Sequence, residues 1–349
     1  METIKKIRFA IVGCGRISAN HVESILQHSS DAELVDICDT DPIALTQMAK
    51  KTGAKPYASL TEMLAHTTAD VVILTTPSGL HPRQAIQVAK AGKHVLSEKP
   101  MATNLTDAKN MIRACDDAGV HLFVVKQNRR NATLQLVKQA IEQGRFGKIY
   151  MLTSNVFWTR PQSYYDQGGW RGLWEFDGGA FMNQASHYVD LLTWLLGPIE
   201  RIHAFTSTLA RNIQAEDSGV VNIKWRSGAL GSMAVTMLTY PKNLEGSITI
   251  LGEKGTVRIG GVAVNEIAHW EFADSRPEDE SIKAANYATT SVYGLGHPLY
   301  YKNVIDTLRG LAKPETDGRA GYESLQTIVG IYKSAREGRE IGLPLGRQE

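Results

Sequence analysis

The chain has 349 residues, of which 43% are hydrophobic, and its 38 basic and 36 acidic side chains leave a formal net charge of +2. A chain of this length usually exceeds one hydrophobic core, so we expect two domains. Near-neutral charge without a run of lysine or arginine disfavours nucleic acid and anionic membranes as partners. Three cysteines without paired spacing, no signal-like start and no membrane-length apolar run together predict a cytoplasmic protein.

The first chemical motif lies near the start of the chain. Apolar residues 7–12 predict a buried strand, and residues 19–26 take helical spacing after Gly13, Gly15 and Ser18. Gly13 allows a tight turn and Gly15 lets the backbone approach a pyrophosphate, while Ser18 takes the usual place of a third glycine. The N–H groups at the helix start would hold the phosphates of a dinucleotide. The cofactor contacts expected here are Gly13, Gly15, Arg16 and Ile17.

A carboxylate follows the second apolar run. Residues 34–38 end at Asp39, about 20 residues beyond the glycines, where dinucleotide-binding folds place an acidic side chain on the adenosine ribose. Because a carboxylate repels a 2′-phosphate, we expect NAD as the cofactor instead of NADP. The alternative is that Asp39 only begins the turn at residues 39–42.

Strands and helices alternate through the rest of the first part. Strands are predicted at residues 70–75, 94–97 and 121–125. Helices are predicted at residues 42–51, 81–91 and 105–118, and a further short helix is predicted to begin at residues 59–62. This alternation predicts an α/β fold with a doubly wound parallel Rossmann sheet. Cofactor contacts are expected at the carboxyl edge of the sheet, from Thr76, Pro77, Ser78, His81 and Glu98. His81 has an equal alternative as a helix N-cap.

The pattern changes near residue 127, which predicts a first domain of residues 1–127 and a second of residues 128–349. Long, partly alternating apolar runs predict a C-terminal α+β domain with a large open, mostly antiparallel sheet. Its strands are expected at residues 149–157, 202–208, 219–225, 230–239, 247–251 and 256–259. Helices are expected at residues 180–196, 299–311 and 322–337, and a surface loop at residues 274–285. In one arrangement the C-terminal helix packs back on the first domain.

Three motifs together resemble the Gfo/Idh/MocA oxidoreductase family: the glycine loop, Glu98-Lys99-Pro100, and the segment from Gly178 to Asp190. The resemblance covers essentially the whole chain and implies an NAD-dependent enzyme. Residues 126–131, 157–161 and 238–243 resemble the bacterial members that oxidise UDP-N-acetyl-D-glucosaminuronic acid at C3. This closer resemblance implies a role in making diacetamido uronic acid for surface polysaccharide such as O-antigen.

The resemblance also implies the catalytic residues. The family's lysine beside the nicotinamide and the reacting hydroxyl matches Lys99, and its Asp-x-x-x-His pair reads Asn183-x-x-x-His187 here. A spacing of four places both side chains on one face of the predicted helix. Because asparagine cannot accept a proton, Lys99 and His187 are the candidate bases, with Lys99 contributing more. Alternatively Lys99 stabilises the oxyanion as a cation while His187 is the base.

Further residues are assigned to binding. NAD contacts are also expected from Lys99, Gln127, Trp170 and Arg171. A diphosphate and a uronate need several bidentate donors and stacking partners, so a UDP-sugar is expected to contact Arg129, Arg130, Arg160, Tyr164, Tyr165, Tyr240 and Lys242, besides Lys99, Asn183 and His187. Surface charges, core packing and a satisfied core histidine are the structural alternatives. No metal is expected, because no His/Cys/Asp cluster has ligand spacing.

The main hypothesis is therefore an NAD-dependent UDP-sugar dehydrogenase. A dehydrogenase of a free sugar or cyclic polyol, and an NAD-dependent glycosidase, are alternatives that the same fold supports. A non-catalytic sugar or nucleotide sensor is a further alternative, against which the presence of Lys99 and His187 argues. The resemblance also implies a homo-oligomer, a dimer or tetramer, that forms through the strands of residues 202–239. It further implies 2-oxoglutarate as an oxidant of bound NADH.

Overall fold

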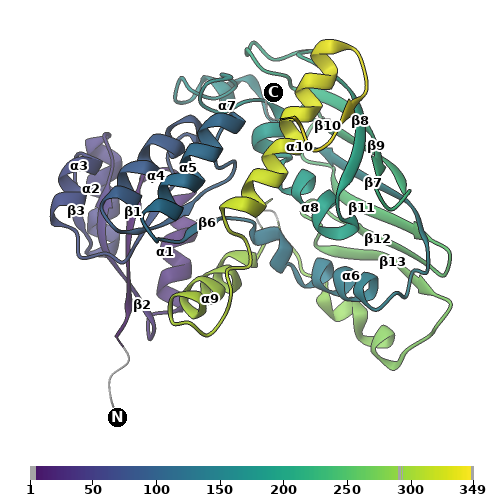
Figure 1. Cartoon of the computed structure of the whole chain (residues 1–349), viewed down its shortest axis with the longest axis horizontal. Coiled ribbons are helices and arrows are strands. Elements are labelled where there is room, and N and C mark those ends of the chain that lie inside the picture. Colours follow the sequence, from purple (N-terminus) through teal and green to yellow (C-terminus); the bar gives the residue numbers. More distant parts are fainter. Residues whose placement is uncertain (1–4, 290–291, 293, 347–349) are drawn as a thin grey trace. The chain divides into compact units, whose positions relative to one another are not determined.

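The protein is described by a computed structural model that covers residues 5–289, 292 and 294–346. It divides into two compact units, Met1–Lys126 with His297–Tyr322, and Gln127–Gly296 with Glu323–Glu349. Figure 1 labels the elements of both units. We describe each unit separately.

In the described part of the first unit, six parallel strands form a sheet with the order β3-β2-β1-β4-β5-β6. The strands are β1 (Ile7–Val12), β2 (Ala32–Cys38), β3 (Lys55–Tyr57), β4 (Val71–Leu74), β5 (His94–Ser97) and β6 (Leu122–Val124). This is the strand order of the doubly wound dinucleotide-binding fold, so the predicted fold class is confirmed. The order reverses between β1 and β4, and such folds bind ligands at the carboxyl ends of strands beside that point.

Helices connect these strands, and several begin at side chains that the sequence predicted. The helices of this unit are α1 (Ser18–Gln27), α2 (Pro42–Thr52), α3 (Leu60–His66), η1 (Ser78–Leu80), α4 (His81–Lys90), α5 (Leu105–Asp117) and α9 (Gly296–Leu308). Asp41, Ser59 and Asn104 cap α2, α3 and α5 by accepting backbone N–H groups of the first turn. Helices α4 and α5 lie side by side (Figure 1).

Residues 297–322 belong to the first unit, whereas the sequence analysis placed residues 128–349 in one domain. The reason is packing, because Tyr300, Tyr301, Val304 and Ile305 of α9 are buried in the same hydrophobic core as Phe9 of β1. The rings of Tyr301 and Phe9 have centroids 5.5 Å apart. A late segment of the chain thus completes the core of the first unit.

In the second unit the described strands form an eight-stranded sheet with the order β13-β12-β11-β7-β10-β9-β8-β14. The strands are β7 (Ile149–Phe157), β8 (Ile199–Ser207), β9 (Ser218–Trp225), β10 (Leu230–Thr236), β11 (Glu245–Gly252), β12 (Gly255–Gly260), β13 (Glu266–Phe272) and β14 (Ile341–Gly342). Strands β7 and β10 pair in parallel and the other neighbours are antiparallel, which confirms the predicted mostly antiparallel sheet.

One face of this sheet is covered by helices (Figure 1). The indole nitrogen of Trp225 in β9 donates to the carbonyl of Leu192 in α8 (Ser186–Leu196) at 3.2 Å. The Ser334 hydroxyl of α10 (Gly318–Glu337) accepts the N–H of Ala204 in β8 at 3.0 Å. The remaining helical elements are η2 (Gln127–Arg130), α6 (Ala132–Glu142), α7 (Gln162–Asp166), η3 (Ala180–Gln184) and η4 (Pro277–Ala285).

The predicted surface loop at residues 274–285 is largely the 3-10 helix η4, so that expectation was wrong. Its anchor is Asp279, which accepts from Nη2 of buried Arg145 at 2.6 Å and from the Trp270 indole at 2.8 Å. The sequence of residues 274–285 shows that this segment is charged. It does not show that Arg145, which is distant along the chain, orders the segment.

No helix in the described part of the chain is both long and apolar enough to cross a membrane.

Candidate active site

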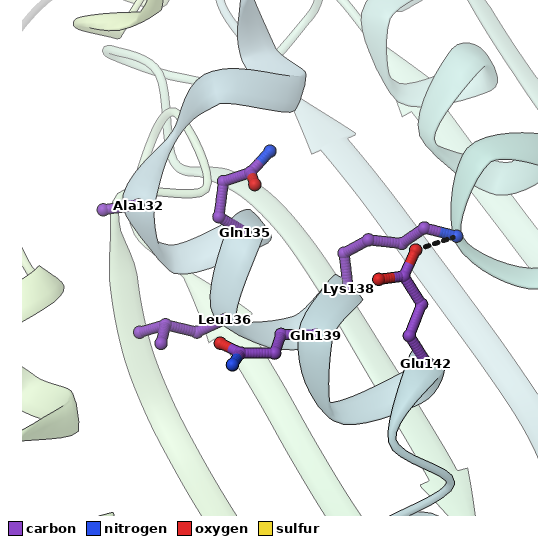
Figure 2. A pocket seen from close by; sticks show the side chains of 6 residues that line it. All are labelled: Ala132, Gln135, Leu136, Lys138, Gln139 and Glu142. Atoms are coloured by element: carbon purple, nitrogen blue, oxygen red, sulfur yellow. Dashed lines mark ion pairs between the residues drawn. The ribbon is translucent and has the colours of Figure 1, made fainter. Parts of the chain in front are cut away.

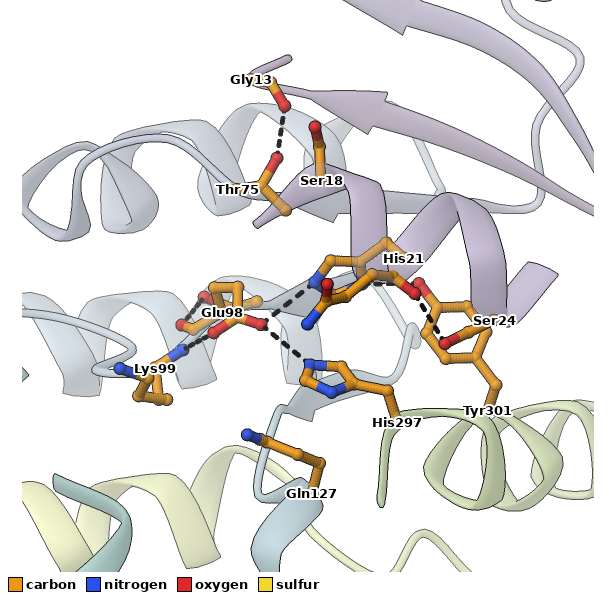
Figure 3. A network of polar contacts seen from close by, with 12 residues as sticks. Gly13, Ser18, His21, Ser24, Thr75, Glu98, Lys99, Gln127, His297 and Tyr301 are labelled. Carbon is orange, nitrogen blue, oxygen red and sulfur yellow. Dashed lines mark hydrogen bonds and ion pairs between the residues drawn. The ribbon is translucent and has the colours of Figure 1, made fainter. Parts of the chain in front are cut away.

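The turn after β1 has room for glycine only. Gly13 has a φ of +100°, and a Cβ there would lie 2.9 Å from backbone atoms of Thr75 and Thr76. The Thr75 hydroxyl donates to the Gly13 carbonyl at 2.6 Å, which joins the ends of β1 and β4 (Figure 3). A Cβ on Gly15 would meet no atom within 4 Å in the described structure. The backbone at Gly15 therefore has open space beside it.

The start of α1 differs from the starts of α2, α3 and α5 because no side chain caps it. Its N-cap residue is Ile17, and no acidic residue lies in its first turn. Ser18 is fully buried and donates its hydroxyl proton to the Gly15 carbonyl at 2.6 Å, so a small side chain is needed there. Exposed Arg16 precedes this helix start. The helix start without a side-chain cap and the open loop fit the pyrophosphate of a dinucleotide.

Asp39 makes one contact that the sequence did not predict, to the glycine loop, and one that fits the turn alternative. One carboxylate oxygen accepts the Cys14 N–H at 2.6 Å and the other accepts the Asp41 N–H at 2.8 Å. Asp39 therefore fixes the glycine loop to the end of β2 and also starts the turn that leads to α2. An ionised carboxylate has about four acceptor positions, so two are left for ribose hydroxyls. The turn and the ribose roles are compatible.

The segment after β4 contains Thr76, Pro77, Ser78 and His81. Both ring nitrogens of His81 lie near backbone carbonyls, 2.8 Å from Thr76 and 3.1 Å from Pro100. Burial lowers the pKa of the His81 imidazole, while its two carbonyl contacts act in the opposite direction. His81 is the first residue of α4 and does not cap it, so the N-cap alternative was wrong. Its ring instead ties the segment after β4 to the one after β5.

Glu98, directly after β5, is the centre of a buried polar network (Figure 3). Its Oε1 lies 3.0 Å from Nε2 of His21, and its Oε2 accepts the Lys99 N–H at 3.0 Å. The hydroxyl of Tyr301 lies 2.7 Å from the other ring nitrogen of His21. Burial raises the pKa of Glu98, but the hydrogen bond from His21 and the imidazole of His297, 3.7 Å away, outweigh it and hold that pKa well below its usual range. The network thus holds an ionised carboxylate beside half-buried Lys99.

His21, Glu98 and His297 also form a group whose potential metal-ligand atoms lie within 4.8 Å of one another. The sequence analysis missed this group because its members are far apart along the chain. Both ring nitrogens of His21 already have hydrogen-bond partners, Glu98 and Tyr301. We therefore interpret the group as a hydrogen-bonded network that fixes the Glu98-Lys99 segment.

In the second unit, the predicted helix at residues 180–196 is two helices. Residues Ala180–Gln184 form the π-helix η3, which carries Asn183, and α8 starts at Ser186 and carries His187. The two side chains therefore belong to adjoining turns of different helices, and the prediction of one continuous helix was wrong. Single π-helical turns occur frequently at functional sites. His187 is buried, and its Nε2 lies 3.0 Å from the amide nitrogen of Gln127. That contact makes Nε2 a hydrogen-bond acceptor.

Glu216 accepts hydrogen bonds from the backbone at the start of the π-helix. Its backbone carbonyl accepts the Ala180 N–H at 3.0 Å, and its Oε1 accepts the Phe181 N–H at 2.8 Å and the Tyr332 hydroxyl at 2.9 Å. A Cβ on Gly179 would lie 1.8 Å from Oε2 of Glu216, so the second glycine of the Gly-Gly motif is required by this close approach. Burial raises the pKa of Glu216 to about 7, with a further contribution from the charge of Asp177.

Asp177 is the second buried carboxylate in this region. Its Oδ2 accepts the Gly172 N–H at 2.7 Å, and its Oδ1 accepts a hydrogen bond from the side-chain amide of Asn183. The sequence analysis did not select Asp177 or Glu216. Their only sequence signal is that Asp177 directly precedes the Gly-Gly motif, while Glu216 lies in a distant connection.

Two predicted substrate residues, Arg160 and Tyr164, lie beside η3, together with Arg171, which was predicted to contact NAD, and Arg211, which was not predicted. The Arg160 guanidinium donates to Oε1 of Gln184 at 2.9 Å, and the Gln184 amide donates to the Tyr164 hydroxyl at 3.0 Å. The guanidinium carbons of Arg171 and Arg160 lie 4.4 and 5.5 Å from the centroid of the Tyr164 ring. The Arg211 Nε donates to the Arg160 carbonyl at 2.7 Å. We call Arg160, Tyr164, Arg171 and Arg211 the arginine cluster, and its positive charge suits a carboxylate or a diphosphate.

Other predicted residues lie apart from this cluster. Arg129 forms a bidentate ion pair with buried Asp190, with two contacts of 2.7 Å, which is a structural arrangement. Tyr165 is buried against Tyr164, with ring centroids 5.1 Å apart. Arg130 and Trp170 are half-buried, and Tyr240 and Lys242 are exposed.

A recess of about 530 Å³ follows helix α6 (Figure 2). It is lined by Ala132, Gln135, Leu136, Lys138, Gln139 and Glu142. Its charged groups pair with each other, because the Lys138 ammonium lies 3.5 Å from the Glu142 carboxylate. None of the predicted site residues lines it, so it is not the candidate active site.

Comparison with known proteins connects both halves of the chain to one family. Residues 7–126 match the sequence model of the oxidoreductase family's NAD-binding Rossmann fold, and residues 138–343 match that of its C-terminal alpha/beta domain. The chain belongs to the Gfo/Idh/MocA oxidoreductase family. This confirms the resemblance inferred from the sequence motifs.

Two family members of known structure are similar to the whole chain. The WlbA dehydrogenase from Bordetella pertussis, crystallised with NADH and UDP-GlcNAcA, is 67% identical, with 99% of each chain covered and a TM-score of 0.96. The WlbA dehydrogenase from Chromobacterium violaceum, crystallised with the same two ligands, is 65% identical over 99% of this chain and 98% of that chain, with a TM-score of 0.94. The myo-inositol 2-dehydrogenase of Thermotoga maritima is a more distant Gfo/Idh/MocA relative, 29% identical over 97% of this chain and 98% of its own.

Proposed function

We propose that this chain is an NAD-dependent dehydrogenase that oxidises the C3 hydroxyl of UDP-N-acetyl-D-glucosaminuronic acid to the 3-keto sugar. The observation that carries this proposal is 67% identity, over 99% of both chains, to a dehydrogenase crystallised with NADH and UDP-GlcNAcA. The 3-keto product would then serve the synthesis of a diacetamido uronic acid for surface polysaccharide.

The first unit fits NAD. Gly13 and Gly15 leave the loop open, the uncapped start of α1 offers N–H groups to the pyrophosphate, and Asp39 retains acceptor positions for ribose hydroxyls. When bound, NAD supplies the acceptor for the C3 hydride. The chain's part is to bind and orient both reactants and to receive the hydroxyl proton.

We assign that proton to Lys99 or His187. Lys99 has its backbone held by the Glu98 network, which fixes where its side chain begins. The Nε2 of His187 faces the Gln127 amide, a contact that must be released before this nitrogen can take the hydroxyl proton. Asn183 cannot take a proton, so we assign it to hydrogen bonding with the sugar. Glu98 keeps its negative charge next to the Lys99 backbone, which favours the positively charged form of the lysine.

We assign the arginine cluster to the acidic part of the substrate. Its guanidinium groups are half-buried and stack on Tyr164, and Arg160 uses neutral oxygens of Gln184, Thr159 and Asn243 as acceptors. A carboxylate or diphosphate oxygen bound there would make charge-assisted hydrogen bonds. Tyr240 and Lys242 lie on the segment next to Asn243 and are the exposed candidates for the rest of the nucleotide.

Substrate competition tests this proposal. NADH formation at 340 nm should show a higher kcat/KM for the UDP-linked uronate than for UDP-N-acetylglucosamine, by about 10-fold or more, because the neutral sugar offers the half-buried guanidinium groups no carboxylate. Equal values for the two sugars would contradict the uronate assignment. Turnover of free sugars or cyclic polyols alone would favour the alternative dehydrogenase, and binding without turnover would favour a sensor.

We further propose that the chain forms a homo-oligomer through the open face of the eight-stranded sheet. This face exposes a row of apolar side chains that are paired across strands, Phe205 with Val220, and Met151 with both Leu230 and Leu251. A second copy of the chain would bury them. We also propose 2-oxoglutarate as the oxidant of tightly bound NADH, which predicts that adding it to the purified protein removes NADH fluorescence.

A further inference from the structure

We propose that Asp177 is a positioning residue that acts through Asn183, supplying from the neighbouring loop the negative charge that residue 183 itself lacks. This inference rests on the proposed dehydrogenase function. Asp177 fixes the Asn183 amide so that its oxygen accepts a hydrogen bond from a hydroxyl of the bound sugar. Neither residue exchanges a proton with the substrate in this arrangement.

The orientation follows from the contacts of Asp177. Its side chain is buried, its Oδ2 accepts the Gly172 N–H at 2.7 Å, and its Oδ1 faces the side-chain amide of Asn183. An ionised carboxylate can only accept hydrogen bonds, so the amide nitrogen of Asn183 must be the atom that faces it. The amide oxygen of Asn183 therefore points away from the Asp177 carboxylate. A carbonyl oxygen of an amide can only accept hydrogen bonds.

The charge of this region belongs to Asp177. Glu216 is also buried close by, where it accepts the Phe181 N–H and the Tyr332 hydroxyl. Burial and the charge of Asp177 raise the pKa of Glu216 to about 7, so Glu216 largely keeps its proton below neutral pH. Of these two carboxylates, Asp177 is the one that contacts Asn183 directly. It polarises the amide and strengthens the oxygen as an acceptor.

The hydrogen bonds that join Asp177 to Gly172 and to Asn183 can be inverted without removing either of them. In Asp177→Asn, the new amide oxygen accepts the Gly172 N–H and its nitrogen donates to Asn183, whose amide must then turn over and present its nitrogen to the sugar. The chain of bonds survives, but residue 183 changes from acceptor to donor. In the double variant Asp177→Asn/Asn183→Asp, the nitrogen of residue 177 donates to a carboxylate at residue 183, which is an acceptor again.

The test is to compare kcat and thermal stability across these variants, with UDP-N-acetyl-D-glucosaminuronic acid and NAD. We expect Asp177→Asn to lower kcat by roughly 10- to 100-fold with an unchanged Tm and NADH affinity, and the double variant to recover to within about 3-fold of the native protein. Asp117→Asn, which alters an exposed carboxylate of α5, is the matched control and should leave kcat unchanged. A native kcat in Asp177→Asn, or no recovery in the double variant, would overturn the proposal.

A second measurement does not depend on turnover, so it separates this inference from the proposed function. In protein labelled with ¹⁵N at asparagine, the side-chain amide protons of Asn183 should exchange with solvent slowly in the native protein and at least 10-fold faster in Asp177→Asn. Absence of turnover with any UDP-sugar would overturn the proposed function, while equal exchange rates would overturn the role of Asp177.

Discussion

Lys99 is the residue on which the proposed chemistry depends most. It follows β5, and its backbone N–H is held by the buried Glu98 carboxylate. Lys99→Met keeps the length of the side chain but removes its charge and its lone pair. We expect NAD binding close to native and a kcat lower by roughly 100-fold or more, the usual effect of removing a general base or an oxyanion donor. Near-native turnover would leave His187 as the only candidate base.

Asp39 offers a prediction about cofactor choice. Asp39→Ala removes the charge that repels a 2′-phosphate and also releases the Cys14 and Asp41 N–H groups. Loss of these backbone contacts should weaken the binding of NAD and NADP alike. The ratio of their Kd values isolates the ribose role, and we expect it to shift toward NADP by about 10-fold. An unchanged ratio, measured by fluorescence titration, would leave Asp39 with only its turn-forming role.

Single residues could be selected from the sequence where their position along the chain indicates a role. Gly13, Gly15 and Asp39 follow buried strands, and the edge of a parallel sheet is where a ligand binds. Asp177 and Glu216 were not predictable, because their importance comes from contacts with Asn183 and the η3 backbone that no local pattern encodes.

At the scale of elements, the sequence predicted most strands well and failed at the π-helix. Residues 180–196 have continuous helical spacing, but backbone N–H groups of Ala180 and Phe181 bond to Glu216, and the Ala185 N–H bonds to the Ala180 carbonyl. The periodicity of apolar residues indicates which side chains are buried, but it does not indicate which acceptors the backbone N–H groups bind. Short β3 and charged β13 were missed because neither has a long alternating apolar run.

The carboxyl group behind the π-helix predicts a pH dependence of stability. The pKa of Glu216 is about 7 in the folded chain, compared with an ordinary value of 4.5. Between these values the folded chain keeps a proton that the unfolded chain has lost, so stability falls as pH rises, by about 1.4 kcal/mol per pH unit. Glu216→Gln replaces the titrating carboxyl group with an amide. Between pH 5 and pH 7, the urea midpoint of this variant should therefore fall less than the urea midpoint of the native protein. Parallel changes in the two proteins would contradict this.

At the scale of the whole molecule, the exposed sheet face predicts self-association. Replacing Phe205 and Val220 with arginine places like charges on a cross-strand pair of β8 and β9, toward one edge of that sheet. We expect the native chain to sediment as a dimer or tetramer at micromolar concentration and the double variant to shift toward the monomer. A matched change of exposed Leu26 in α1 to arginine should have no effect. A native monomer would contradict the assignment.

Residues 300–305 also determine when the first unit can finish folding. A ribosome delivers β1 early, but Tyr300, Tyr301, Val304 and Ile305, which share its core, leave the exit tunnel only when most of the chain has been made. Until then, part of the hydrophobic core of the nascent first unit is exposed to water. Chains in such a state bind chaperones and tend to aggregate. Synthesis rate and chaperone supply, more than the strength of any single contact, should then limit the yield of this protein in an expressing cell.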